Sequence, residues 1–183
     1  MLGIKRTVLF DIKTILSKMD IGERQQVAEL GCGNFGFFAF PLARLVGRQG
    51  KVYAVDILKS TLEEIKKEAV KDNLPQIIPI WSNLEIFKAT NIETNSLDNA
   101  FLINTLHQSD KKIEILREAI RLLKRGGKLL IIEWKSIDSP LGPAAEKRVK
   151  IESLKNVTAK IGLDIKEEFE AGPYHYGLIL IKL

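Results

Sequence analysis

Three glycines stand close together directly after a short apolar run, in VAELGCGNFG at residues 27–36. Glycine has no Cβ atom, so such a turn lets the backbone approach a phosphate, a ribose or an amino-acid end group closely. Gly31, Gly33 and Gly36 have the spacing G-x-G-x-x-G, and Asp56 stands twenty residues after Gly36. A carboxylate there can accept hydrogen bonds from ribose hydroxyls. The pattern predicts a site for a nucleoside-containing ligand, and by itself it fits NAD as well as other nucleosides.

Polar side chains that could take part in a reaction follow two later apolar runs. His107 comes directly after the run AFLINTL, and imidazole titrates near neutral pH, so it is the best candidate for a general base. A histidine that only shapes the pocket is the alternative. Glu133, Trp134 and Lys135 end another run, KLLIIEWK, and are weaker candidates for lining an acceptor pocket. The sequence PYHY at 173–176 most simply forms a packed turn.

Helices and strands alternate along the chain and must position these residues. The apolar spacing predicts helices over 8–19, 37–47, 61–73, 111–125 and 151–162, with Ser60 and Glu63 as a capping box for the third. Strands are predicted over 27–30, 51–57, 77–81, 97–104 and 128–134, followed by a closing pair over 164–171 and 176–183. Such alternation predicts a parallel sheet with helices on both faces, whose ligands bind at the carboxyl ends of the strands.

Composition limits the class of protein. The 183 residues are 45% hydrophobic and 28% charged, as in an ordinary globular domain, and no apolar run reaches the length of a membrane span. No signal peptide is readable, so we expect a cytoplasmic protein that does not associate with membranes. The net charge of +5 is spread over interleaved acidic and basic residues, which argues against a nucleic-acid partner. The lone cysteine, Cys32, excludes an internal disulfide and a multi-thiolate metal site, and we expect no metal.

Several segments, in order, resemble the class I S-adenosylmethionine-dependent methyltransferases. The stretch VAELGCGNFGFFAFPLARLVGRQGKVYAVDI resembles their cofactor-binding half. SLDNAFLINTLHQ and LREAIRLLKRGGKLLIIEWKS resemble the fourth and fifth strands of the ubiquinone and menaquinone methyltransferase-like branch. The resemblance implies an α/β, Rossmann-like, doubly wound and mostly parallel seven-stranded sheet with an antiparallel C-terminal strand. It covers nearly the whole chain, so we expect 1–183 to be a single domain, led by an N-terminal helix within 1–22.

The resemblance also implies a set of cofactor contacts at matching positions. Gly31 and Gly33 would allow close approach of the methionine part of S-adenosylmethionine, and Glu29 would help to hold its amino group. Asp56 would bind the ribose, Ile57 would cover the adenine, and Asn83 would accept a hydrogen bond from the adenine amino group. The backbone around Asn104 would meet the amino-acid end. Two departures from the family pattern are the extra residue Phe35 in the glycine turn and Asn83 in place of an acid.

These observations predict a methyltransferase that acts on a small molecule. The sequence has neither an added nucleic-acid-binding module nor the Asn/Asp-Pro-Pro-aromatic signature of base methylation, and it has too few cysteines for arsenic methylation. A nicotinamide-dependent oxidoreductase is the alternative enzyme, and a non-catalytic S-adenosylmethionine-binding domain is the alternative binding protein. The sequence allows either a monomer or a homo-oligomer. Fold analogy does not identify the methyl acceptor.

Overall fold

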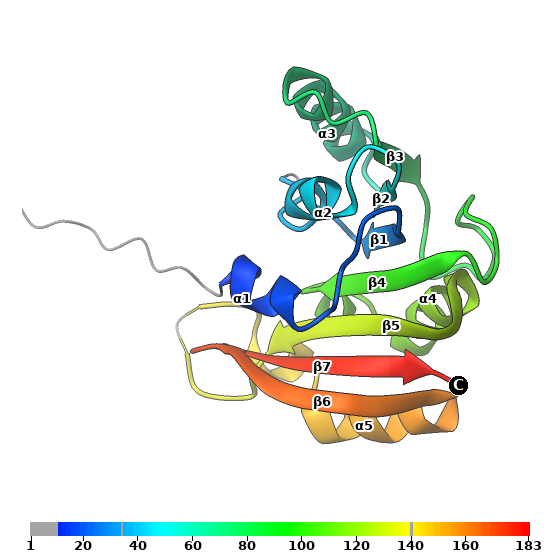
Figure 1. Cartoon of the computed structure of the whole chain (residues 1–183). Helices are drawn as coiled ribbons and strands as arrows, with labels where there is room; N and C mark the ends of the chain where they lie inside the picture. Colours follow the sequence, from blue (N-terminus) through cyan, green and yellow to red (C-terminus); the bar gives the residue numbers. More distant parts are fainter. Residues whose placement is uncertain (1–10, 34, 140) are drawn as a thin grey trace, which may run out of the picture.

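The computed structural model describes residues 11–33, 35–139 and 141–183, which form one seven-stranded sheet with helices on both faces (Figure 1). The strands are β1 (Gln26–Leu30), β2 (Lys51–Asp56), β3 (Ile77–Trp81), β4 (Leu97–Ile103), β5 (Leu123–Trp134), β6 (Leu163–Gly172) and β7 (His175–Lys182). The helices are α1 (Ile12–Ser17), α2 (Ala39–Val46), α3 (Lys59–Lys71), α4 (Lys112–Leu122) and α5 (Ile151–Lys160), with 3₁₀ turns η1 (Leu106–Gln108) and η2 (Ala145–Lys147).

The strand order β3-β2-β1-β4-β5-β7-β6 confirms the predicted topology. Neighbours from β3 to β5 are parallel, whereas β7 runs antiparallel to both β5 and β6. The chain turns from β1 first to β2 on one side and later to β4 on the other, so the strand order reverses at β1. Ligands of open α/β sheets bind at such a reversal, beyond the carboxyl ends of the strands.

Two apolar clusters hold the layers together. Successive side chains of a strand point to opposite faces of the sheet. One cluster therefore joins Val27 and Phe101 to residues of α1, α2 and α3, and the other joins Ala28 and Leu102 to residues of α4 and α5. The helices of the cofactor half thus lie on one face, and those of the later half on the other (Figure 1).

Several helix boundaries differ from the prediction by a few residues. The capping box at Ser60 is wrong, because α3 begins at Lys59, two residues before the predicted start, and no side chain caps it. Helix α4 ends at Leu122 rather than 125, because its last carbonyls receive other donors. The backbone amide of Ser96 binds the Leu122 carbonyl oxygen at 2.9 Å, and Lys182 Nζ binds the Ile120 and Leu123 carbonyl oxygens at 2.7 and 2.8 Å.

The N-terminal helix is shorter in the structure than predicted. Helix α1 spans Ile12–Ser17 and is capped by Asp11, whose carboxylate accepts a hydrogen bond from the Lys13 amide at 3.0 Å. Residues 8–10 of the predicted helix lie outside the described residues. No helix in the described part of the chain is long and apolar enough to cross a membrane.

Candidate cofactor and active site

A cavity of about 300 Å³ opens at the carboxyl ends of β1 to β4, where the strand order reverses. It has the size of a small-molecule site at the lower end of the usual range. The lining residues come from four segments that follow these strands: Gly31, Gly33, Asp56, Ile57, Leu58, Thr61, Ser82, Asn83, Leu84, Glu85, Thr105, Gln108, Ser109 and Ile115. Five of the seven predicted cofactor contacts are among them.

The glycine turn presents its backbone to this cavity. Gly31 and Gly33 have φ angles of +81° and +60°, a conformation that side chains rarely adopt. A Cβ atom on Gly31 would lie 2.8 Å from the side chain of Thr105, whose hydroxyl donates a hydrogen bond to the Leu30 carbonyl oxygen at 3.1 Å. A Cβ atom on Gly33 would meet no protein atom within 4 Å. The position over Gly33 is therefore open among the described residues, and Gly33 lines the cavity.

Asp56 is fixed at the end of β2 with part of its carboxylate still available. Its two oxygens each accept a backbone hydrogen bond at 2.9 Å, one from the Gly33 amide and one from the Leu58 amide. A carboxylate offers about four acceptor positions, so two remain for a ligand. Ile57 is 53% exposed beside it and gives the cavity an apolar wall. This arrangement fits a ribose next to a flat apolar ring.

The far wall of the cavity carries an acid that the sequence analysis did not single out. Asn83 lines the cavity as predicted, and its side-chain oxygen accepts a hydrogen bond from the Glu85 amide at 2.9 Å. Glu85 lines the cavity too, and its carboxylate accepts a hydrogen bond of 2.6 Å from the hydroxyl of Ser109. Glu85 and Ser109 follow different strands, so only the fold brings them together.

Glu29 lies behind the turn rather than in the cavity lining. It is 3% exposed, and its two oxygens accept hydrogen bonds from the backbone amides of Phe38 and Ala39 at 3.3 and 2.8 Å. It therefore caps the first turn of α2 and anchors the loop that contains the glycines. Burial raises the pKa of Glu29 to about 8, and the nearby charge of Asp56 adds to the increase.

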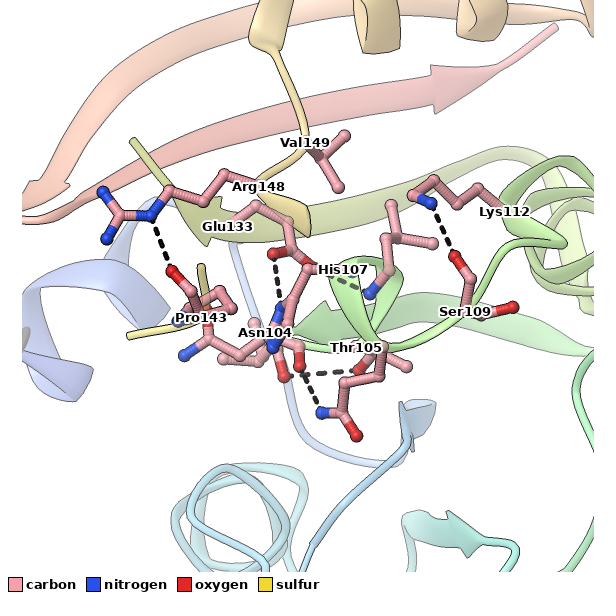
Figure 2. A network of polar contacts seen from close by, with 12 residues as sticks. Asn104, Thr105, His107, Ser109, Lys112, Glu133, Pro143, Arg148 and Val149 are labelled. Atoms are coloured by element: carbon pink, nitrogen blue, oxygen red, sulfur yellow. Dashed lines mark hydrogen bonds and ion pairs between the residues drawn. The ribbon is translucent and has the colours of Figure 1, made fainter. Parts of the chain in front are cut away.

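His107 and Asn104 also lie beside the cavity lining rather than in it. Asn104 has a φ of +53°, and its carbonyl oxygen accepts a hydrogen bond from the Gln108 side chain at 2.7 Å. The ring of His107 is 13% exposed, and its Nδ1 lies 2.9 Å from Oε2 of Glu133 (Figure 2). Since Thr105, Gln108 and Ser109 line the cavity, His107 belongs to the segment that forms its edge.

The loop after β5 is held by Arg148, and Figure 2 shows its hydrogen bond to the Pro143 carbonyl oxygen. The guanidinium donates to carbonyl oxygens of alternate residues: Lys135 (3.2 Å), Ile137, Ser139 (3.4 Å), Leu141 (3.0 Å) and Pro143 (3.0 Å). These five bonds satisfy all five N–H groups of the arginine. Gly142 of the same loop lies against the ring of Trp134, which packs on His175 with ring centroids 4.1 Å apart.

The remaining groups of interest have structural surroundings. Cys32 is buried, and its burial raises the pKa of the thiol, so it is not a reactive nucleophile. No cluster of three or more metal-ligating side chains occurs among residues 11–33, 35–139 and 141–183. Further cavities of about 640 and 310 Å³ lie along α1, and neither is lined by the glycine turn or by Asp56.

Comparisons with known proteins agree with this geometry. A methyltransferase domain family model matches residues 21–170. A ubiquinone/menaquinone biosynthesis C-methyltransferase UbiE from Rhizobium etli is 34% identical over 113 residues, which is 60% of this chain and 42% of the relative. An S-adenosyl-L-methionine-dependent Diels-Alderase from Talaromyces variabilis is 27% identical over 150 residues, covering 81% of this chain and 49% of the relative. The chain thus spans less than half the length of both curated relatives.

A solved structure extends the similarity to the whole fold. The crystal structure of a SAM-dependent methyltransferase from Aquifex aeolicus superposes with a TM-score of 0.88 at 25% identity, covering 99% of this chain and 94% of that one. The family match spans most of the residues that build the sheet and every residue that lines the cavity at the glycine turn. The chain therefore belongs to the class I S-adenosylmethionine-dependent methyltransferases and is similar to the UbiE branch.

Proposed function

We propose that residues 1–183 act as one methyltransferase domain that binds S-adenosylmethionine in the cavity at the glycine turn and methylates a small molecule. The observation that carries the proposal is the open space over Gly33, which faces the same cavity as the Asp56 carboxylate. Backbone access and a ribose acceptor are the two features that a nucleoside bound through its sugar needs at this edge of the sheet. Family membership selects S-adenosylmethionine from the nucleosides that would fit.

The cavity residues suit the three parts of this cofactor, which supplies an electrophilic methyl group when bound. Gly33 leaves room for the amino-acid part, Gly31 lets the Thr105 side chain pack against the turn, and Asp56 has free acceptor positions for the ribose hydroxyls. Ile57 offers an apolar surface to adenine, and Asn83 or Glu85 can accept a hydrogen bond from its amino group. In this proposal Glu29 supports the glycine turn and does not contact the cofactor, because its carboxylate accepts a hydrogen bond from the Ala39 amide at the start of α2.

The acceptor is a small molecule that enters beside η1. Methyl transfer needs an acceptor lone pair aligned with the methyl carbon, so positioning supplies most of the catalysis. A base is needed when the acceptor must lose a proton, and His107 is the side chain best suited to take it. Asn104, at the end of β4, meets the amino-acid end of the cofactor in this proposal.

Two other functions compete with methyl transfer. A nicotinamide-dependent oxidoreductase would use the same glycine turn, but no match reported above favours it. A domain that binds S-adenosylmethionine without transferring its methyl group is the stronger competitor, since one relative is named as a Diels-Alderase. Fold alone does not separate these activities.

Calorimetry with S-adenosylhomocysteine and NAD tests the cofactor assignment. We expect saturable binding of S-adenosylhomocysteine and none of NAD, and mass spectrometry of the purified protein should find the sulfur ligand rather than a nicotinamide. A screen of phenols, quinols, amines and thiols with labelled cofactor then tests transfer. Tight NAD binding without a response to S-adenosylhomocysteine would end the proposal, and cofactor binding with no transfer to any acceptor would favour the binding domain.

Three further expectations belong to this proposal. We infer that the protein is cytoplasmic, as expected from the sequence analysis. We also infer that it has no nucleic-acid partner, since its charges of both signs are interleaved. Any binding to RNA or duplex DNA should be lost at moderate salt. Sequence-selective binding at physiological salt would contradict the small-molecule assignment. Light scattering decides whether the chain forms a homo-oligomer.

A further inference from the structure

Glu133 is a carboxylate buried in an otherwise apolar strand. It is 0% exposed, and its neighbours in β5 are Ile131, Ile132 and Trp134. No lysine or arginine pairs with it anywhere in the part of the chain that the structure describes, and its one ion-pair partner there is His107. A buried carboxylate is costly unless its oxygens are satisfied, so its hydrogen bonds indicate what it does.

The two oxygens of Glu133 have different partners. Oε1 accepts hydrogen bonds from the backbone amides of Leu106 and His107, at 2.7 and 3.3 Å. Oε2 lies 2.9 Å from Nδ1 of His107 (Figure 2). A backbone amide can only donate, so Oε1 must be an acceptor. One carboxylate thus fixes both the η1 turn and the ring of the histidine that the turn carries.

This contact determines which ring nitrogen of His107 carries the proton. A carboxylate accepts but does not donate, so Nδ1 of a neutral His107 must hold its hydrogen toward Oε2. The lone pair of the neutral ring is then on Nε2. No hydrogen bond to Nε2 occurs within the described residues, so the protein there does not occupy this lone pair.

The second histidine does not share this arrangement. His175 is fully buried against Trp134. Burial lowers its pKa to about 4, and the nearby positive charge of Lys135 contributes. His175 therefore stays neutral at physiological pH, whereas His107 has the Glu133 carboxylate against its Nδ1.

We propose that Glu133 is a positioning residue that holds His107 with Nε2 unprotonated, ready to accept the proton of a methyl acceptor. The inference rests on the proposed function and adds the residue that makes the histidine a base. In the step concerned, the acceptor's lone pair forms the bond to the methyl carbon while the carbon–sulfur bond breaks and leaves its electron pair on sulfur. The proton lost by the acceptor moves to Nε2, and Glu133 stabilises the resulting imidazolium.

Glu133→Gln gives a sharp test, because the structure determines how the amide must sit. The glutamine oxygen has to occupy the Oε1 position, since two backbone amides donate there. Its NH₂ group then faces Nδ1 of His107 and donates to it. The ring must exchange tautomers, so that Nε2 becomes protonated and can no longer accept a proton. An analogous substitution in the serine protease triad is known to impose the wrong tautomer.

Long-range ¹H–¹⁵N NMR reads the tautomer directly, and the chain has two histidines, so the spectrum is simple to assign. We expect the Nδ1–H form of His107 in the wild type and the Nε2–H form in Glu133→Gln, with the His175 signal unchanged as the internal control. Turnover of any acceptor found in the screen should fall about a hundredfold or more. The affinity for S-adenosylhomocysteine should stay within about twofold, because Glu133 does not line the cavity.

Three outcomes would contradict the inference. A wild-type His107 with Nε2–H, or a variant that keeps the wild-type tautomer, removes the positioning role. A tautomer change with full turnover shows that Glu133 only supports the fold. If Glu133→Gln does not fold, the wild-type spectrum alone decides whether Nε2 is the unprotonated nitrogen. Failure of the wild type to bind S-adenosylhomocysteine is a separate result that ends the proposed function and leaves the tautomer assignment intact.

Discussion

Replacing Gly33 with alanine would test whether the glycine turn faces a ligand. Gly33 has a φ of +60°, its amide binds Asp56, and no protein atom lies within 4 Å of the position that a Cβ atom would take. The added methyl group would therefore meet no part of the protein. It would stand in the cavity at the place where the proposed cofactor approaches the backbone.

Gly126→Ala is the matched control for the backbone effect. Gly126 has a φ of +78°, an added Cβ atom there also meets nothing within 4 Å, and the residue lies outside the cavity. A left-handed conformation costs a non-glycine residue about 1–2 kcal/mol. For a chain of this size, each kcal/mol lowers the melting temperature by about 2–4 °C. Both variants should thus melt about 2–8 °C below the wild type.

Only Gly33→Ala should weaken cofactor binding. Forcing an extra methyl group into a filled, well-packed site costs about 1–3 kcal/mol, which corresponds to a loss of affinity of about 5- to 150-fold. Isothermal titration with S-adenosylhomocysteine measures this loss, and Gly126→Ala should bind as the wild type does. Equal affinities of Gly33→Ala and Gly126→Ala would show that no ligand approaches this turn, and the cofactor assignment to this cavity would have to be abandoned.

Three further substitutions test the other roles. Asp56→Asn removes the charge that the ribose would bind, so S-adenosylhomocysteine affinity should fall by about 1.5–3 kcal/mol in calorimetry, and unchanged binding would remove Asp56 from the site. The pKa of Glu29 is about 8 in the folded protein and near 4.5 in the unfolded chain. Between these two pH values the unfolded chain loses this proton first, so the free energy of unfolding falls as pH rises from 4.5 to 8. Urea unfolding should show the wild type losing about 2 kcal/mol more than Glu29→Gln between pH 6 and pH 8, whereas parallel pH profiles would mean that Glu29 is already ionised at pH 6. His107→Ala should lower turnover about a hundredfold with little change in S-adenosylhomocysteine affinity, but a higher KM at constant kcat would make His107 a pocket-shaping residue.

The fold could be predicted from the sequence because its strands and helices have strong local patterns. The runs VAEL, KVYAVDI and KLLIIEW are short and apolar, and amphipathic helices separate them, so the parallel order follows. Helix ends were less predictable because they depend on distant groups. Lys182, near the end of the chain, helps to end α4, and nothing near Leu122 in the sequence indicates it.

The site was predictable where neighbouring residues build it. The glycine turn and Asp56 belong to one strand–turn–helix–strand unit, so their spacing predicted that they lie together. Glu85 and Ser109 were missed because they follow different strands and meet only in the folded chain. Glu133 was named only as a weak candidate for the pocket lining. The signal that could have identified its role is an acidic residue in an apolar strand, which needs a buried partner.

The loop held by Arg148 has a consequence for how acceptor preference could be changed. The arginine binds only carbonyl groups of this loop, and every residue type supplies a carbonyl group. The side chains of Ile137 and Leu141 can therefore be varied while the loop keeps its bonds to Arg148, whereas Ser139 is kept because its hydroxyl accepts a hydrogen bond from the Leu141 amide at 3.1 Å. A library restricted to Ile137 and Leu141, on a fixed Arg148, would sample new surfaces on the loop that begins directly after β5, the strand that carries Glu133.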